Sequence, residues 1–201
     1  MSPGSFHRDL RAALRERALD VAARVTAGNG WSAVRMTAIA DEVGVSRQTL
    51  YAEFGSRASL AEALVERELR RVLDAVRVAM RDADTDVAAV EAAVAAALRE
   101  AGASALVHGA LRSVDPSMDL LRLLTTDAGP LVAAATTVVC GELSRADTST
   151  VIEPVVRLTV SHVLAPGADP DEVARRIVDF ARPSLMAAGL TGSLPSRHPP
   201  R

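Results

Sequence analysis

No proline occurs between Pro3 and Pro116, a stretch that covers more than half of the 201 residues. Proline breaks helices because it lacks a backbone N–H and clashes with the preceding turn. Alanine, the best helix former, is the most frequent residue type, with 38 copies. A β-sandwich or barrel would show alternating β-branched and aromatic residues, with turn signals about every 8–12 positions, and that pattern is missing. The sequence therefore predicts an all-α fold.

Length and composition narrow the class of protein further. A chain of this length with 49% hydrophobic residues can form one domain, or two small ones, around a substantial core. Its single cysteine, Cys140, excludes an internal disulfide and fits a reducing cytoplasm. The longest uncharged runs have 14 residues, whereas a membrane span needs about 20 apolar ones, and the N-terminus lacks a signal-peptide pattern. We therefore expect a cytoplasmic protein without membrane contact.

Apolar residues recur at spacings of three and four along the chain, which is typical of amphipathic helices. The helices expected from this pattern cover residues 8–27, 36–43, 47–53, 57–82, 86–101, 104–113, 117–125, 130–145, 148–164 and 170–188. In the first, the expected buried stripe consists of Leu10, Leu14, Ala18, Val21 and Val25. Ser46, Ser56 and Asp169 are expected to cap the third, fourth and last helices, because their side chains can accept the free N–H groups of a first turn.

Patterns that carry catalysis or bind metals are scarce. The four histidines lie far apart, and no spacing would put two metal ligands on one helical face. The chain has no Gly-x-Ser-x-Gly elbow and no Cys-x-x-Cys pair. Residues 28–33 match a dinucleotide fingerprint, but a helix precedes them rather than a strand, so we interpret them as a helix C-cap and turn. We expect no catalytic residue, metal or cofactor.

The most informative stretch is residues 36–54, MTAIADEVGVSRQTLYAEF, in which two short helical patterns flank a turn at Gly44. This is the helix-turn-helix layout, whose second helix enters the DNA major groove. Arg47, Gln48 and Thr49 would face outward, where arginine can bind guanine and glutamine can bind adenine. Eight arginines against six acids up to residue 57 also favour an anionic partner. Two ordinary amphipathic helices with polar outer faces remain the alternative.

Residues in and after this stretch resemble the TetR/AcrR family of bacterial transcriptional regulators. They are Ile39-Ala40, Val43-Gly44-Val45-Ser46, Thr49-Leu50-Tyr51, Phe54-Gly55-Ser56-Arg57 and Leu60. The resemblance is specific over residues 10–64 and only architectural beyond them. It implies a homodimeric, ligand-responsive regulator, most often a repressor, that binds a palindromic double-stranded DNA operator through the major groove and is released by a small apolar effector. It also implies a helix-turn-helix DNA-binding domain at 1–56 and a helical effector-binding and dimerisation domain at 57–190. The Gly, Ser and Pro content from Gly189 onward predicts a flexible tail at 191–201.

The resemblance assigns the DNA contacts to residues in and around the second helix of the motif. They are Thr37, Ser46, Arg47, Gln48, Thr49, Tyr51 and Arg57. Two positions depart from the family pattern. Arg35 replaces a frequent capping threonine, so the first helix of the motif needs another cap, and Ala52 replaces a frequent polar residue, which removes one potential DNA contact.

The rest of the chain is expected to bind the effector and to form the dimer. Candidate lining residues of the effector pocket are Leu106, His108, Leu111, Met118, Leu121, Leu124, Leu131, Val138 and His162. Candidate dimer contacts, on helices 148–164 and 170–188, are Val151, Val155, Leu158, Val173, Ile177 and Phe180, although ordinary core fits these positions equally. Phe180 is the only aromatic residue after Phe54, which favours an aliphatic or acyl effector over a cation in an aromatic cage.

We expect effector binding to change the spacing of the two recognition helices through the helix at 57–82. Other classes of protein remain open at this point. A helical small-molecule-binding protein or enzyme without specific DNA binding would fit Ala52 and the small positive charge of the first 57 residues. A purely dimerising adaptor is a third possibility.

Overall fold

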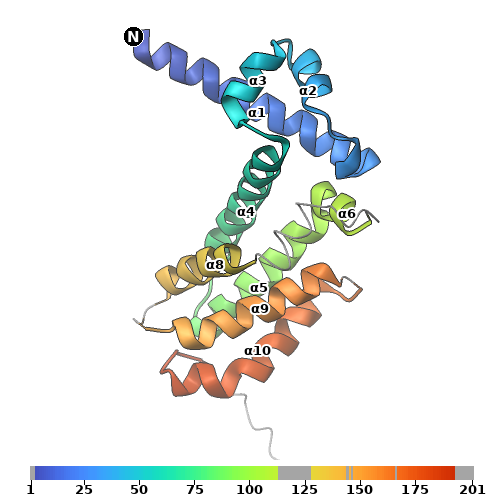
Figure 1. The fold of residues 1–201 in the computed structure, drawn as a ribbon. Coiled ribbons are helices and arrows are strands. Elements are labelled where there is room, and N and C mark those ends of the chain that lie inside the picture. The colour runs from blue at the N-terminus through green and yellow to red at the C-terminus, as the bar shows by residue number, and fades with distance from the viewer. Residues whose placement is uncertain (1–2, 113–127, 144, 146, 166, 193–201) are drawn as a thin grey trace, which may run out of the picture. The chain divides into compact units, whose positions relative to one another are not determined.

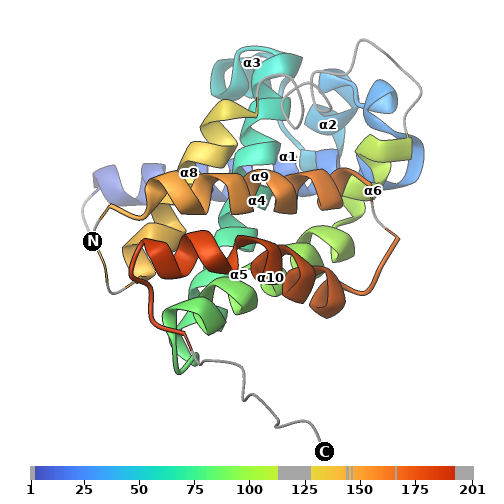
Figure 2. The ribbon, with the colours of Figure 1, turned by 90° about the horizontal axis from the view of Figure 1, so that it is seen from below.

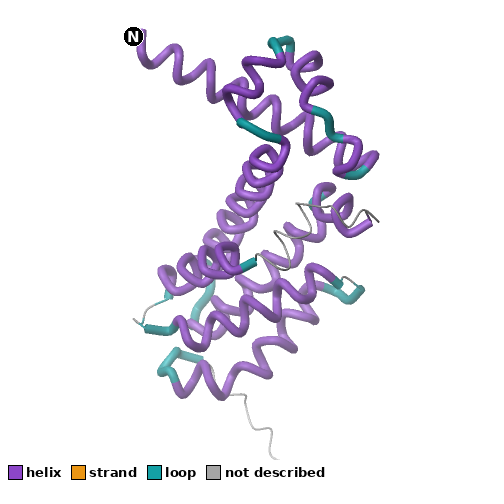
Figure 3. Tube along the Cα trace, in the orientation of Figure 1, coloured by secondary structure: helices purple, strands orange, loops and turns teal. Residues whose placement is uncertain are grey.

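The structure is a computed structural model that describes residues 3–112, 128–143, 145, 147–165 and 167–192. All regular elements in these residues are helices (Figure 3), which confirms the predicted all-α fold. The elements are α1 (Pro3–Asn29), the 3-10 turn η1 (Trp31–Ala33), α2 (Met36–Val43), α3 (Arg47–Phe54), α4 (Arg57–Arg81), α5 (Asp86–Ala103), α6 (Ala105–Arg112), α8 (Gly129–Glu142), α9 (Ser149–Leu164) and α10 (Pro170–Ala187). Most bounds lie within two residues of the expected ranges, but α1 begins at residue 3 rather than 8, and α8 ends at residue 142 rather than 145. The expected helix at 117–125 lies outside the described residues.

The described chain forms two compact units. The head unit consists of the described residues of 1–69 and 104–128, and the body unit consists of those of 70–103 and 129–201. The expected domain boundary at residue 57 is the start of α4, whereas the two units divide inside α4, after Leu69. The head unit also takes in α6, which the expected boundary assigned to the second domain.

The head is built around α1, which α2 and α3 cross (Figure 1). Its core contains Trp31 and the fully buried Leu19, Ile39, Leu50 and Leu60. Helix α6 packs against α1 so closely that a Cβ at Gly109 would lie 2.5 Å from the carbonyl oxygen of Thr26. Glycine at this position therefore permits the contact between the two helices.

The expected buried stripe of α1 is only partly correct. Ala18 and Val21 are buried, and Leu14 and Val25 are partly buried, but Leu10 is 59% exposed. The N-terminal end of α1 projects beyond α3 (Figure 1), and Leu10 is not among the residues of the head core. Periodicity shows which face of a helix is apolar, but it does not show how far along the helix the packing extends.

In the body, α5 packs against α9 and α10, and α8 packs against α9 (Figure 2). Alanine and valine make up most of the buried face of α5. After α10 the chain returns to the start of α5, where the carboxylate of Asp86 accepts hydrogen bonds from the backbone N–H of Thr191, at 2.9 Å, and from its hydroxyl, at 2.8 Å. None of the described helices has both the length and the apolar character needed to cross a membrane.

Candidate nucleic-acid interface

The turn between α2 and α3 depends on one glycine. Gly44 has a φ of +81°, a left-handed conformation that side chains disfavour. The backbone N–H groups of Gly44 and Val45 both donate to the carbonyl oxygen of Ala40, at 3.0 Å. These bonds end α2 and turn the chain into α3.

The N-terminal caps of α2, α3 and α4 can be compared with those expected from the sequence. The Oγ of Ser46 accepts the backbone N–H of Thr49 at 3.0 Å, which confirms Ser46 as the N-cap of α3. Ser56 accepts the N–H of Ser59 in the same way at 3.0 Å, which confirms the cap of α4. Arg35, by contrast, stands at the N-cap of α2 and makes no side-chain capping bond. We expected Arg35 to leave α2 in need of another cap. At this N-cap position no side chain forms a capping hydrogen bond.

Helix α3 buries Leu50 and Phe54 in the head core. Its opposite face is exposed and carries Arg47, Gln48, Thr49, Tyr51 and Ala52. The guanidinium carbon of Arg47 lies 5.2 Å from the centre of the Tyr51 ring, within cation–π distance. Thr37, on α2, is also exposed. This face presents guanidinium, amide and hydroxyl groups, which are the groups that bind base edges and phosphates.

Ion pairs between residues far apart in sequence join α1 to the motif. Glu53, whose side chain is only 8% exposed, binds both Arg11 and Arg15, the latter at 3.3 Å. Arg24 pairs with Glu42 on α2. Partners of this kind are 18 to 42 residues apart in sequence, so local spacing could not reveal them. Exposed pairs contribute little individually, but together they hold α3 and α2 against α1.

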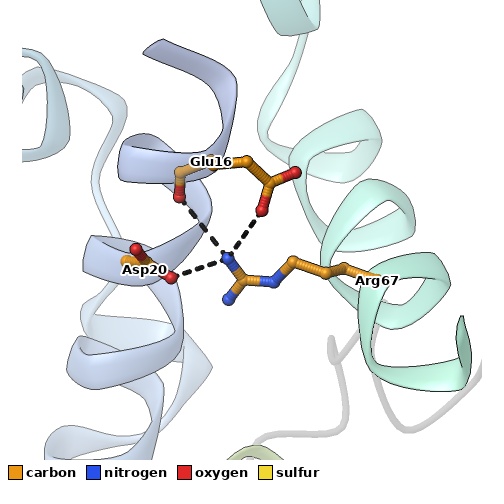
Figure 4. Close-up of polar contacts among 3 residues, drawn as sticks. All are labelled: Glu16, Asp20 and Arg67. Carbon is orange, nitrogen blue, oxygen red and sulfur yellow. Dashed lines mark hydrogen bonds and ion pairs between the residues drawn. The ribbon is translucent and has the colours of Figure 1, made fainter. Parts of the chain in front are cut away.

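Helix α4 is fastened to α1 through one guanidinium. Nη1 of Arg67 lies 2.7 Å from a carboxylate oxygen of Asp20 and 3.4 Å from both the carboxylate and the backbone carbonyl oxygen of Glu16 (Figure 4). The Arg67 side chain is 15% exposed, so its charge interacts through less water than that of a fully exposed pair. The contact fixes the first half of α4 within the head.

The structure places Arg57 differently from the other expected DNA contacts. Its Nη2 donates to the carbonyl oxygen of Trp31 at 2.5 Å, and its guanidinium carbon lies 5.1 Å from the centre of the Trp31 ring. The side chain is therefore engaged within the head, where it links the start of α4 to the turn after α1.

The expected effector-pocket residues fall into both units. Leu106 is buried in the head core, and the His108 ring bonds the carbonyl oxygen of Ser104 at 3.0 Å, also in the head. Leu131 and Val138 pack against the body core, and His162 is half-buried on α9. The Leu111 side chain, Met118, Leu121 and Leu124 lie outside the described residues. The pocket remains a prediction.

The expected dimer residues divide by exposure. Val155, Val173 and Ile177 are buried within the body's own core, and Val151 and Leu158 pack partly against it. Phe180 is 79% exposed. Of these six candidate residues, only Phe180 has a side chain that is largely exposed and could contact a second subunit.

Two family models match the sequence. Residues 18–64 match the bacterial regulatory proteins of the tetR family, and residues 82–183, about half of the chain, match the C-terminal domain of the bacterial tetracyclin repressor. The chain belongs to the TetR family. It is a DNA-binding transcriptional regulator with an N-terminal helix-turn-helix, as expected from the resemblance.

Similar proteins support the assignment over most of the chain. The HTH-type transcriptional regulator AlkX of Mycobacterium tuberculosis is 33% identical over 183 residues, covering 85% of this chain and 86% of AlkX. The crystal structure of the TetR family repressor AlkX from Dietzia, implicated in biodegradation of n-alkanes, is 28% identical, with a TM-score of 0.69 over 86% of this chain and 97% of that one. The repressor QsdR of R. erythropolis, 19% identical with a TM-score of 0.59 over 92% and 98% of the chains, shows the shared fold alone.

Proposed function

We propose that this TetR-family regulator is a homodimeric repressor that binds a palindromic DNA operator and is released by a small aliphatic or acyl effector. The observation that carries the proposal is α3 itself, a capped helix that buries Leu50 and Phe54 and exposes Arg47, Gln48 and Thr49 on one face. In this arrangement α3 enters the major groove, Arg47 binds a guanine and Gln48 binds an adenine.

The remaining exposed groups of the motif hold the DNA backbone. Thr37, Ser46, Thr49 and Tyr51 carry hydroxyl groups that can donate to phosphate oxygens, which positions α3 without reading sequence. We assign Arg57 an indirect role, because its guanidinium already holds the Trp31 carbonyl. It keeps the N-terminus of α4 in place beside α3.

Dimerisation is assigned to α9 and α10, with Phe180 as the central contact. A palindromic operator requires a two-fold symmetric protein. Phe180, 79% exposed on α10, is the candidate dimer residue that the body core leaves uncovered, and aromatic residues are enriched in the cores of protein interfaces.

We place the effector in the body and infer its aliphatic or acyl chemistry on two grounds. Phe180 is the only aromatic residue of the chain beyond Phe54, so an aliphatic lining fits the composition. The Dietzia AlkX repressor, 28% identical to this chain, is implicated in n-alkane biodegradation, which favours a ligand of aliphatic chemistry here as well. Because α4 belongs to both units, it is the element through which binding would alter the heads, with a coupling free energy of about 1–3 kcal/mol.

The proposal is tested by titrating labelled DNA from the promoter of the regulator's own gene and measuring fluorescence anisotropy. Arg47→Ala and Gln48→Ala should each weaken specific binding by about 1–3 kcal/mol, because each removes a bidentate base contact. Tyr51→Phe should weaken binding to all sequences equally, since it removes a phosphate contact. Arg70→Ala, an exposed arginine of α4 outside the motif, is the control. Full operator affinity in all three variants of α3 would contradict the proposal.

A further inference from the structure

A groove of about 590 Å³ lies in the head beside the recognition helix. One wall is the first half of α1, with Leu10, Ala13 and Leu14, and the other is the α2–α3 turn with α3, including Val45, Thr49 and Ala52. Thr49 and Ala52 also belong to the exposed face of α3. The groove is therefore continuous with the surface that we assign to the operator.

The charges around the groove are unbalanced toward positive. Its one lining carboxylate, Glu53, is bound by both Arg11 and Arg15, so this cluster of three keeps one surplus positive charge. Arg17 lines the same groove and is exposed, and within the described part of the chain no carboxylate lies within ion-pair distance of it. Arg24, farther along α1, is instead paired with Glu42.

We propose that this groove extends the DNA-binding surface onto α1 and receives the sugar–phosphate backbone beside α3, with Arg17 binding a phosphate. The chemistry of the groove matches that of the backbone, because the deoxyribose carbons can contact Ala13 and Val45 while the phosphate binds a guanidinium. None of the DNA contacts implied by the family resemblance lies on α1. The inference rests on the proposed function, since it requires α3 to occupy a major groove.

The test uses the full-length protein and measures how operator affinity depends on salt concentration. Each phosphate contact releases counterions, so Arg17→Gln should lower the slope of log K against log salt by about 1 for each bound head. At about 0.1 M salt this corresponds to about a fivefold to tenfold loss of affinity per head. The loss should be equal for the operator and for unrelated DNA, because a phosphate contact carries no sequence information.

Three further variants make the result specific to the groove. Arg17→Lys keeps the charge and should retain the salt slope. Arg24→Gln removes the same charge from the same helix, but from a residue already paired with Glu42, and should leave the slope unchanged. Ala13→Glu adds a carboxylate to the groove wall and should weaken binding to all DNA by repelling the phosphates. The melting temperature of each variant is recorded to show that the head remains folded.

The outcomes separate this inference from the proposed function. An unchanged slope in Arg17→Gln, while Arg47→Ala still loses operator binding, would overturn the groove and leave the proposed function intact. Equal losses in Arg17→Gln and Arg24→Gln would also overturn it, since the effect would then follow the charge of α1 as a whole. A wild-type protein that binds no DNA at all would overturn the proposed function, and the groove with it.

Discussion

Arg57 matches the family pattern in sequence, but its side chain contacts Trp31 within the head. The resemblance placed Arg57 among the DNA contacts, yet its Nη2 donates to the Trp31 carbonyl at 2.5 Å and its guanidinium stacks on the indole. The Trp31 carbonyl also accepts the backbone N–H of Val34 at 3.0 Å, so losing Arg57 removes one of its two donors; a bond from a charged donor is the stronger kind. We therefore assign Arg57 to the stability of the head.

Replacing Arg57 tests that assignment. Arg57→Met keeps the apolar stem and removes the guanidinium, so the free energy of unfolding should fall by about 1.5–3 kcal/mol in urea titrations. Arg35→Met is the matched control, because Arg35 is exposed and such changes stay within about 0.5 kcal/mol. Unchanged stability together with a reduced salt slope of DNA binding would instead place Arg57 on a phosphate.

The sequence predicted single residues well where the cause is local. Ser46 caps α3 as expected, because capping depends on residues three positions apart. The pairing of Glu53 with Arg11 and Arg15 was missed, since the partners are brought together only by the crossing of α1 and α3. Leu10 was expected to be buried and is exposed, because helical periodicity does not reveal where a packing partner ends.

Helices α6 and α1 pack so closely at Gly109 that the position has no room for a side chain. A Cβ at Gly109 would lie 2.5 Å from the carbonyl oxygen of Thr26 and 3.1 Å from its carbonyl carbon. These are backbone atoms, so they cannot move aside as a flexible side chain would. The interface therefore requires glycine at this position, and α6 keeps its place in the head through it.

A methyl group at that position should force the two helices apart. Gly109→Ala is expected to lower the free energy of unfolding by about 1–3 kcal/mol, the usual cost of overpacking. Gly28→Ala, near the end of α1, is the control: its Cβ would meet nothing within 4 Å, so the better helix propensity of alanine should leave stability unchanged or raise it by up to about 1 kcal/mol. Both are measured by urea denaturation, and equal stability of the two variants would contradict the close packing.

Helix positions were predicted more accurately than helix partners. Alanine content, glycine stops and capping residues placed α2, α3 and α10 within one or two residues of their observed bounds. The expected second domain, residues 57–190, included both α5 and α6, but α6 belongs to the head. This division depends on contacts between residues far apart in sequence, such as Gly109 with Thr26, and those contacts have no periodic signature.

The whole protein is proposed to act as a dimer, and Phe180 is the side chain best placed to show it. It is 79% exposed on α10, whereas Val155, Val173 and Ile177 are buried in the body's own core. The sequence pattern could not separate these two groups, because core and interface residues have the same apolar periodicity. Exposure in the folded body makes the distinction.

Phe180→Asp should convert the dimer to monomers in sedimentation equilibrium, because it places a charge at a desolvated contact worth about 2 kcal/mol or more. The stability of the monomer should be unaffected, since the side chain is exposed. Val78→Asp, at a residue of α4 that is 60% exposed, is the control and should leave the dimer intact. A Phe180→Asp protein that remains dimeric would place the interface elsewhere.

The central claim is that α3 of each of two heads reads one half of a symmetric DNA site. Selection of bound sequences from a random DNA pool with the full-length protein tests it most directly. The account predicts an inverted repeat whose half-site centres are about 10 base pairs, or a multiple of that, apart, and loss of this enrichment in the Arg47→Ala, Gln48→Ala double variant. A pool without any enriched sequence, or an enriched site without two-fold symmetry, would contradict it.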